Sequence, residues 1–418
     1  MNTYVTEPED AQQTGLPHPP PRPRRRWLRW AALGASLAVL AAGGAAWVLY
    51  NRLDGNIRTD VEAADQLRRF DRERPAAVVH EAKNILLIGS DDRSGDNGRY
   101  GRDSGTQRSD TAILLHLSAD RSSATGVSIP RDLMVDIPEC PGPDGTTARP
   151  LFAQFNWAYE RGGAACTIRT VENLTGIRVD HHLIVDFTGF ENLVDAVGGV
   201  EVCLAEPVND PEAHLVLDAG PQRLDGEQAL GYVRARKGIG DGSDTQRMER
   251  QQEFLSTLLR QVRDDGLLTD PAELYRVLDA VTSSLTADPG LDSLPELYDL
   301  VSGVRDMPAE RVRFMTVPRQ PYTYDPNRDE LVQPDADLLF AALRDDRPVP
   351  AEGGGEPGGR PAGDSSAVPS AEPSAAPSAG AGVPASAPGA GAREPSTAPT
   401  GSPSGSPSGS PSAGSPCG

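Results

Sequence analysis

Seven arginines stand where the sequence predicts the ends of strands and helices, so that side chains from different segments can converge there. They are Arg93, Arg108, Arg131, Arg234, Arg236, Arg247 and Arg250. Arginine stays protonated and presents a planar fork that matches phosphate oxygens, and each charge-assisted hydrogen bond is worth roughly 1.5–3 kcal/mol. A single surface arginine is usually solvated or ion-paired. Their shared location at element ends therefore predicts a binding site for a polyphosphate.

Two aspartates flank the first strand–loop–strand connection of the expected domain. Asp91 follows the apolar run 84–89, and Asp110 leads into the next run at 111–118. Carboxylates beside a pyrophosphate suit a hard divalent cation, for which Mg²⁺ is the natural choice. The same two aspartates could instead pair with neighbouring arginines or cap turns. The residue types alone leave both interpretations open.

Other reaction classes lack their motifs in this sequence. There is no Gly-x-x-x-x-Gly-Lys-Ser/Thr loop, which excludes a P-loop nucleotidase, and no Gly-x-Ser-x-Gly elbow, which weakens a serine hydrolase. His181 and His182 are adjacent and point to opposite faces of an extended segment, so they are not expected to bind a metal. The formal net charge of −20 argues against a nucleic-acid binder, although basic residues concentrated in one cleft can still bind a small anion.

Alternating strands and helices must position these side chains. The expected strands are 84–89, 111–118, 125–129, 183–187 and 200–204, and the expected helices between them are 155–161, 166–175 and 190–197. Such interleaving predicts an α/β domain with a mostly parallel or mixed sheet that is covered on both faces. Ligands of open α/β sheets bind outside the carboxyl ends of the strands, which points to the segments after 84–89 and 125–129.

The second half of the domain carries further basic residues. Asp225 is the expected N-cap of a short helix, with Gln228 at the capping-box position. If the following segment is extended, Arg234 and Arg236 share one of its faces.

A longer helix is expected over 245–262, with Asp244 as its cap. Spacings of three and four residues place one group of side chains on a single face near its N-terminus. This group comprises Arg247, Arg250, Gln251 and Phe254. The helix dipole favours an anion at the same end.

The N-terminal part of the chain predicts a membrane anchor. Residues 31–50 are uncharged and about long enough to span a bilayer, and arginines crowd the N-terminal side of this run. The positive-inside rule then puts the N-terminus in the cytoplasm and the rest outside. A cleaved signal peptide is the alternative.

The predicted organisation is a cytoplasmic basic, Pro-rich segment at 1–30, a transmembrane helix at 31–50, a solvated stalk at 51–83, a folded extracytoplasmic domain at 84–347 and a disordered Ser/Pro/Gly/Ala-rich tail at 348–418.

Four cysteines, Cys140, Cys166, Cys203 and Cys417, lack the spacing of a zinc or thioredoxin-type site. In an extracytoplasmic domain, Cys140 and Cys166 are the most plausible disulfide pair, closing the polar loop around residues 142–145. Four cysteines allow three sets of pairings, and the sequence alone does not choose among them.

Several ordered motifs between residues 84 and 262 resemble the LytR-CpsA-Psr family of cell-envelope proteins. The motifs are Leu87-Ile88-Gly89-Ser90-Asp91, Arg108-Ser109-Asp110-Thr111, Ser128-Ile129-Pro130-Arg131-Asp132, Val194-Asp195-Ala196-Val197-Gly198-Gly199-Val200, Leu224-Asp225-Gly226-Glu227-Gln228-Ala229-Leu230, Tyr232-Val233-Arg234-Ala235-Arg236 and Arg250-Gln251-Gln252. The resemblance implies a three-layer α-β-α domain with a mixed central sheet and a hydrophobic tunnel for a polyprenyl chain. It also implies Mg²⁺-dependent transfer of a glycopolymer from polyprenyl pyrophosphate to peptidoglycan.

The resemblance also implies roles for individual residues. Asp91 and Asp110 would sit at the metal, and Asp91 would help to deprotonate the acceptor hydroxyl. The pyrophosphate would be bound by Arg93, Arg108, Arg131, Arg234, Arg236, Arg247 and Gln251. Two rival functions use the same side chains: a non-catalytic binder of wall glycan or its lipid-linked precursor, and a polyprenyl-pyrophosphate hydrolase. The family's older regulatory label does not suit an acidic domain outside the membrane.

Overall fold

The computed structural model describes residues 24–91, 109–141, 146–240, 242–264, 271–305 and 307–349. Two predicted site residues, Arg93 and Arg108, lie outside these ranges. So do Cys417, the loop 142–145 and the predicted tail from residue 350 onward.

Helix α1 (Arg24–Asp54) contains the predicted membrane span 31–50. Its part from Trp27 onward is long and apolar enough to cross a membrane, and no other helix in the described ranges is. The apolar side chains of α1 between residues 27 and 50 are exposed, with Trp30 at 74% and Leu40 at 72%, whereas a helix of a water-soluble domain buries its apolar stripe. This helix fits a single-pass membrane protein.

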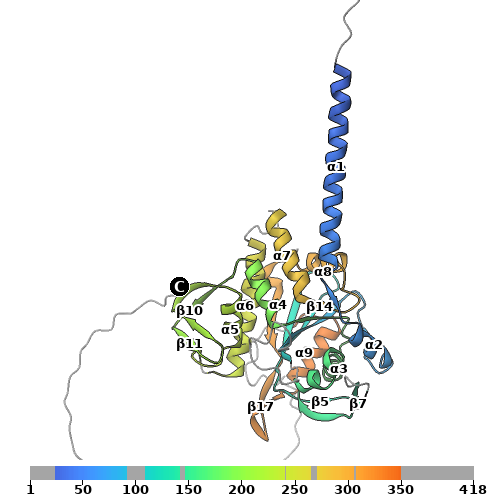
Figure 1. The fold of residues 1–418 in the computed structure, drawn as a ribbon. Coiled ribbons are helices and arrows are strands. Elements are labelled where there is room, and N and C mark those ends of the chain that lie inside the picture. Colours follow the sequence, from blue (N-terminus) through green and yellow to red (C-terminus); the bar gives the residue numbers. More distant parts are fainter. Residues whose placement is uncertain are drawn as a thin grey trace, which may run out of the picture. The chain divides into compact units, whose positions relative to one another are not determined.

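A mixed sheet of seven strands forms the centre of the fold within the described residues (Figure 1). In spatial order the strands are β1 (Arg58–Thr59), β14 (Leu285–Ala287), β9 (His181–Val185), β2 (Lys83–Ser90), β3 (Ser109–Leu117), β4 (Ala124–Ile129) and β15 (Val312–Thr316). Strands β9, β2, β4 and β15 run in one direction, and β14, β1 and β3 run in the other. This mixed sheet confirms the predicted one.

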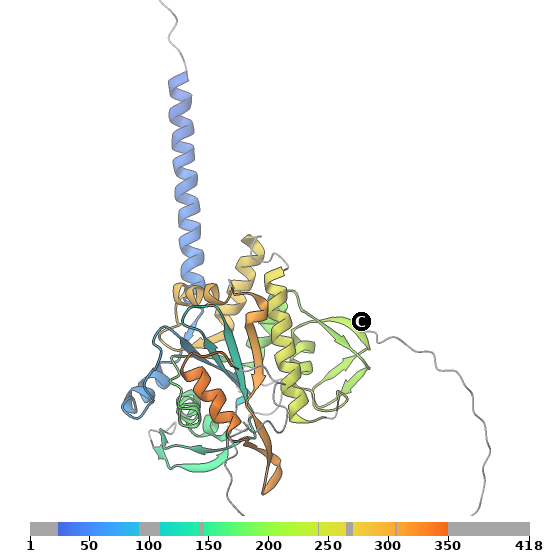
Figure 2. The ribbon, with the colours of Figure 1, turned by 180° about the vertical axis from the view of Figure 1, so that it is seen from behind.

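Side chains alternate along β2 between the two faces of the sheet. Leu86 and Ile88 belong to the core on one face, and Ile85 and Leu87 belong to the core on the other. The first face is covered by α2 (Val61–Arg69), α3 (Trp157–Thr175) and α9 (Asp335–Arg344), and the second by α8 (Leu294–Arg305). Figure 2 shows α3 and α9 on the near side of the sheet. The domain is therefore the three-layer α-β-α fold that the family resemblance implied.

A third core joins four helices to two small antiparallel strand pairs. The helices are α4 (Phe187–Ala196), α5 (Gly226–Arg234), α6 (Asp244–Asp264) and α7 (Pro271–Ser284), and the strands are β10 (Val200–Leu204), β11 (Val208–Asp210), β12 (Leu215–Leu217) and β13 (Gly220–Leu224). The predicted strand 200–204 is thus β10, but it pairs with β13 outside the central sheet. The hydrophobic alternation of a strand does not specify which strand lies beside it.

Three further strand pairs flank the sheet. They are β5 (Met134–Ile137) with β8 (Leu151–Gln154), β6 (Cys140–Pro141) with β7 (Thr147–Ala148), and β16 (Arg319–Tyr322) with β17 (Asp325–Leu331), and a 3₁₀ turn, η2 (Ala309–Arg311), precedes β15. The two helices predicted at 155–161 and 166–175 form the single element α3, which is kinked where Gly162 and Gly163 leave helical geometry.

The sequence predicts a solvated stalk over 51–83, and this prediction is wrong. Ile57 and Leu67 are each 8% exposed and belong to the domain cores. The side chain of Arg74 donates to the carboxylate of Glu172 in α3 at 2.7 Å, and the Glu172 side chain is only 2% exposed. A short amphipathic helix such as α2 gives a weak sequence signal because its packing partners lie about a hundred residues further along the chain.

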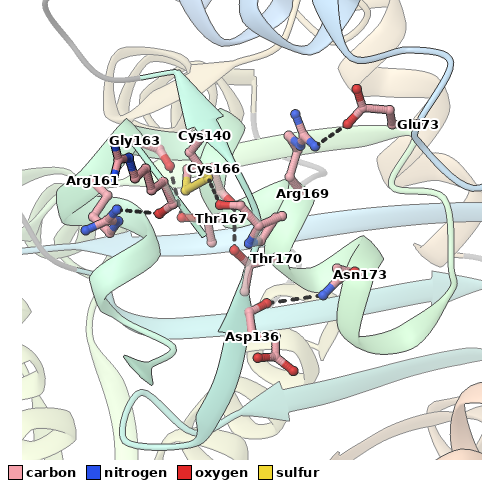
Figure 3. The surroundings of a disulfide bond; sticks show 12 residues. Glu73, Asp136, Cys140, Arg161, Gly163, Cys166, Thr167, Arg169, Thr170 and Asn173 are labelled. Carbon is pink, nitrogen blue, oxygen red and sulfur yellow. Dashed lines mark hydrogen bonds and ion pairs between the residues drawn. A yellow bond between two sulfur atoms is a disulfide. The ribbon is translucent and has the colours of Figure 1, made fainter. Parts of the chain in front are cut away.

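The disulfide between Cys140 and Cys166 confirms the predicted pair. It joins β6 to α3, as Figure 3 shows, and both cysteines are fully buried. Hydrogen bonds around it hold the same region together, including one from Asn173 in α3 to the carbonyl of Asp136 in β5. The β5–β8 hairpin is therefore fixed to the α3 layer.

Gly126 in β4 gives a first testable prediction. A Cβ at this position would lie 2.6 Å from Cδ1 of Phe314 on the neighbouring strand β15. Real Cβ atoms do not approach so closely, so the ring or the strand must shift, at a cost of about 1–3 kcal/mol for overpacking. We expect Gly126→Ala to lower the free energy of unfolding by that amount, measured by urea denaturation. Gly303→Ala, whose Cβ would meet nothing closer than 3.5 Å, is the control.

Candidate functional site

A cavity of about 650 Å³ lies between the sheet and helices α4, α5 and α6. One part of it is apolar. Its walls there include Leu87, Ile113 and Leu183 from the sheet and Phe190, Phe254 and Leu258 from the helices. A lining of this kind presents an apolar surface to a ligand.

The other part of the cavity is polar, because the directions of the strands bring several charged side chains to the same edge of the sheet. Since β2 and β4 run the same way, Asp91 and Arg131, which follow them, emerge at the same edge of the sheet. Strand β3 runs the opposite way and begins at that edge with Asp110 as its second residue. All three side chains line the cavity. The sheet thus gathers at its carboxyl edge three of the residues predicted from sequence.

Arg131 lies between two carboxylates at this edge. Its Nη1 donates to Oδ1 of Asp110 at 2.7 Å, and its Nε donates to Oδ2 of Asp132 at 3.3 Å. Burial by itself lowers the pKa of Arg131, but the charges of Asp110 and Asp132 outweigh burial and raise that pKa above its ordinary value. Arg131 therefore carries a fixed positive charge in the wall of the cavity.

Helix α6 brings Arg247 and Gln251 to the cavity from its first two turns. The Arg247 side chain is 6% exposed and pairs with Oδ1 of Asp244 at 2.6 Å. Burial lowers the pKa of Arg247, Asp244 opposes this, and the nearby charge of Arg131 lowers the pKa further. The Nε of Arg247 is buried and has no hydrogen-bond partner among the described residues. An anion between Arg131 and Arg247 would relieve their repulsion and supply an acceptor.

Arg234 and Arg236 both line the cavity, but the extended segment predicted to align them is not present. Arg234 is the last residue of α5, whose capping box at Asp225 and Gln228 has the predicted form. Its guanidinium lies over the ring of Phe187, 4.3 Å from the centroid. Arg236 lies 3.8 Å from Asp244. The helix extends further than expected because Tyr232 and Val233 pack into the third core.

Arg250, the seventh predicted arginine, does not line the cavity. Its guanidinium donates to the carbonyl of Ala235, which ties α6 to the end of α5. Gln252 donates to Ser128 at 3.0 Å and to Thr316 at 2.9 Å, which ties α6 to the sheet. These two residues position α6.

Sequence reasoning missed several polar residues of the cavity as site residues, among them Asp132, Gln154, Asn156 and Arg328. Asp132 accepts from Gln154 at 2.9 Å and lies 3.4 Å from Nη1 of Arg328. Asp132 directly follows Arg131, so its position in the sequence could have identified it as a site residue. Gln154 and Arg328 could not be identified in this way, because they lie on hairpins that are distant in the sequence. Asn156 is buried at 5% exposure, but its Oδ1 has no partner among the described residues.

Asp91 and Asp110 are the two predicted ligands of a divalent cation. Asp91 and Asp110 both line the cavity, and Oδ1 of Asp110 accepts from Arg131. No group of three or more His, Cys, Asp or Glu side chains that could hold a metal occurs in the described ranges. Mg²⁺ is commonly held by only one or two carboxylates together with substrate phosphates. The residues present therefore fit a Mg²⁺ ion that arrives with a pyrophosphate.

A family model described as the LytR_cpsA_psr family matches residues 51–341, which is most of the chain. The chain belongs to this family. The matched range begins at residue 51, in agreement with the packing of residues 51–83 into the domain.

Relatives of this LytR_cpsA_psr protein include a probable cell wall biosynthesis protein, LcpB, from Corynebacterium glutamicum. It is 39% identical over 236 residues, which is 54% of this chain and 54% of LcpB. The chain thus spans about half the length of this relative. The polyisoprenyl-teichoic acid–peptidoglycan teichoic acid transferase TagU of Oceanobacillus iheyensis is 30% identical over 288 residues, 68% of this chain and 83% of TagU. A LytR-Csp2A-Psr enzyme from Actinomyces oris shares the fold, with a TM-score of 0.51 and 22% identity over 65% of this chain and 93% of that one.

Proposed function

We propose that this protein transfers a glycopolymer from a polyprenyl-pyrophosphate carrier to peptidoglycan during cell wall assembly. One observation carries the proposal: a single cavity joins an apolar part to a part lined by Arg131, Arg234, Arg236 and Arg247. A lipid pyrophosphate has the same two-part chemistry, with a hydrocarbon chain next to concentrated negative charge. The names of LcpB and TagU support this class of reaction.

We place the domain outside the membrane, with the N-terminus in the cytoplasm. The arginines on the N-terminal side of the apolar run 31–50 support this orientation through the positive-inside rule. The Cys140–Cys166 disulfide supports it as well, because disulfides persist in oxidising compartments outside the cytoplasm.

In the proposed reaction the polyprenyl chain lies in the apolar part and the pyrophosphate lies beside Arg131 and Arg247. An acceptor hydroxyl attacks the phosphorus that carries the glycan. A new O–P bond forms while the bond from that phosphorus to the polyprenyl phosphate breaks, and the acceptor proton passes to Asp91. The arginines hold the negative charge of the departing polyprenyl phosphate, so catalysis rests on positioning and charge neutralisation.

Mg²⁺ held by Asp91 and Asp110 would neutralise phosphate charge in the same site. Arg93 and Arg108, outside the described residues, belong to the same proposal as ligands of the pyrophosphate, together with Gln251, which also lines the cavity.

The experiment uses the full chain in detergent with a polyprenyl-pyrophosphate saccharide, a soluble peptidoglycan fragment and Mg²⁺. We expect transfer of the saccharide that EDTA abolishes. Asp91→Asn keeps the shape of the side chain but removes its charge and its basicity, so we expect about a hundredfold lower kcat. Asp218→Asn, at an exposed carboxylate away from the cavity, is the matched control and should transfer at the wild-type rate.

Two outcomes would contradict the proposal in different ways. Binding of the lipid without transfer or cleavage, unchanged in Asp91→Asn, would indicate a binding protein. Release of free saccharide phosphate with no label on the peptidoglycan would indicate a hydrolase that uses water as its acceptor.

A further inference from the structure

Two hairpins beside the polar part of the cavity share three aromatic side chains. The ring of Phe152 in β8 lies 6.1 Å from that of Tyr322 in β16, and Tyr322 lies 5.4 Å from Tyr324 in the turn that follows. Phe152 is 49% exposed and Tyr324 is 85% exposed. We propose that Phe152, Tyr322 and Tyr324 form an aromatic platform that binds the glycan strand of the acceptor. This inference rests on the proposed transferase function, and it assigns the binding site of the second substrate, the peptidoglycan acceptor.

The aromatic platform is continuous with the cavity. Gln154 lies two residues after Phe152 on the same face of β8, about 7 Å further along the strand, and it lines the cavity. Arg328 on β17 lines the cavity too. The two hairpins are joined where Leu133 and Asp329 form a β-bridge. A strand of sugars lying on the platform would therefore reach the carboxylates and arginines of the site.

The chemistry of the platform suits a carbohydrate. Exposed aromatic rings present flat apolar faces that can stack on the apolar faces of sugar rings. Around them stand hydrogen-bonding groups that can exchange partners with sugar hydroxyls: Gln320 donates to Glu330 at 2.9 Å, Thr323 donates to Glu330 at 3.1 Å, and Asn327 donates to Asp325 at 3.1 Å. The two carboxylates make the same surface unsuited to anionic lipid headgroups, which attract basic segments.

The geometry of the proposed displacement favours the acceptor, rather than the donor, as the ligand of the aromatic platform. In an in-line displacement the attacking oxygen approaches the phosphorus opposite the leaving oxygen. The leaving oxygen belongs to the polyprenyl phosphate, whose chain extends into the apolar part between the sheet and α6. The acceptor must then enter through the polar part of the cavity, where Gln154 and Arg328 contact Asp132 beside Arg131 and where the platform begins.

The platform is tested by binding rather than turnover, with the full chain in detergent. The probe is a soluble peptidoglycan fragment of several disaccharides, and its Kd is measured by calorimetry. We expect Phe152→Ala and Tyr324→Ala each to raise this Kd about threefold to tenfold. Tyr324→Phe keeps the ring and should restore most of the affinity. Tyr298→Ala, at a tyrosine of α8 that is 63% exposed, is the matched control and should leave the Kd unchanged.

A second arm measures the Kd of the polyprenyl-pyrophosphate saccharide for the same variants, which should stay within twofold of wild type. The proposal is overturned if the peptidoglycan Kd is unchanged in both alanine variants. It is also overturned if only the lipid-linked saccharide binds more weakly, since the platform would then hold the donor. Neither Kd measurement needs turnover. Absence of transfer in the wild type would therefore contradict the proposed function, and the two Kd values would still show whether the platform binds the acceptor.

Discussion

Arg131→Ala is expected to lower kcat for glycan transfer about a thousandfold. Arg131 donates to both Asp110 and Asp132, and its guanidinium lines the cavity. Its loss removes a positive charge from the proposed pyrophosphate site and takes an ion-pair partner from both carboxylates. Both changes repel a phosphate, and both act most strongly when negative charge builds on the leaving group. Steady-state transfer assays at saturating donor give kcat directly.

Two variants control this result. Arg131→Lys keeps the charge but cannot form the two-pronged contact, so we expect it to recover roughly tenfold of the lost rate. Arg223→Ala removes an exposed arginine that pairs with Glu201 at 2.7 Å outside the cavity, and it should transfer like the wild type. If Arg131→Ala keeps more than about a tenth of wild-type kcat, the pyrophosphate does not depend on this arginine.

Replacing both Cys140 and Cys166 by alanine is expected to lower the free energy of unfolding by about 3.5 kcal/mol. The disulfide closes a loop with a sequence separation of 26 residues, and without it the unfolded chain gains the entropy of that loop. The measurement is urea denaturation followed by circular dichroism, comparing free energies extrapolated to water.

The paired serine variant serves as the comparison. Both cysteines are fully buried, so two hydroxyls there need hydrogen-bond partners, and we expect Cys140→Ser with Cys166→Ser to be less stable than the alanine pair. A loss below about 1 kcal/mol in the alanine pair would mean that the packing of α3 against β5 and β6 holds this region without the disulfide.

The hairpin β5–β8 connects this prediction to function. The disulfide and the bond from Asn173 to Asp136 fix the hairpin that carries Phe152 and Gln154. Loss of the disulfide should therefore weaken binding of the acceptor more than binding of the donor.

Local patterns in the sequence predicted much of the central sheet and the charged side chains that line the cavity. Apolar runs at 84–89 and 125–129 identified β2 and β4, because a buried strand must present large apolar side chains to both covering layers. The residues after those runs, Asp91 and Arg131, line the cavity because strands of the same direction end at the same edge. The capping box at Asp225 was readable because it needs only neighbours three residues apart.

The tertiary structure decided what depends on distant partners. It placed residues 51–83 in the domain, continued α5 through Arg234, and brought Gln154 and Arg328 to the cavity on separate hairpins. None of these is fixed by local spacing, since each depends on burial against segments far away in the chain. By itself the sequence determined the long apolar N-terminal helix, the strands and the charges at their ends, because these follow from composition and from contacts between near neighbours. Which of those charges share one cavity was decided only by long-range packing, whose free energy is summed over many contacts that no short motif contains.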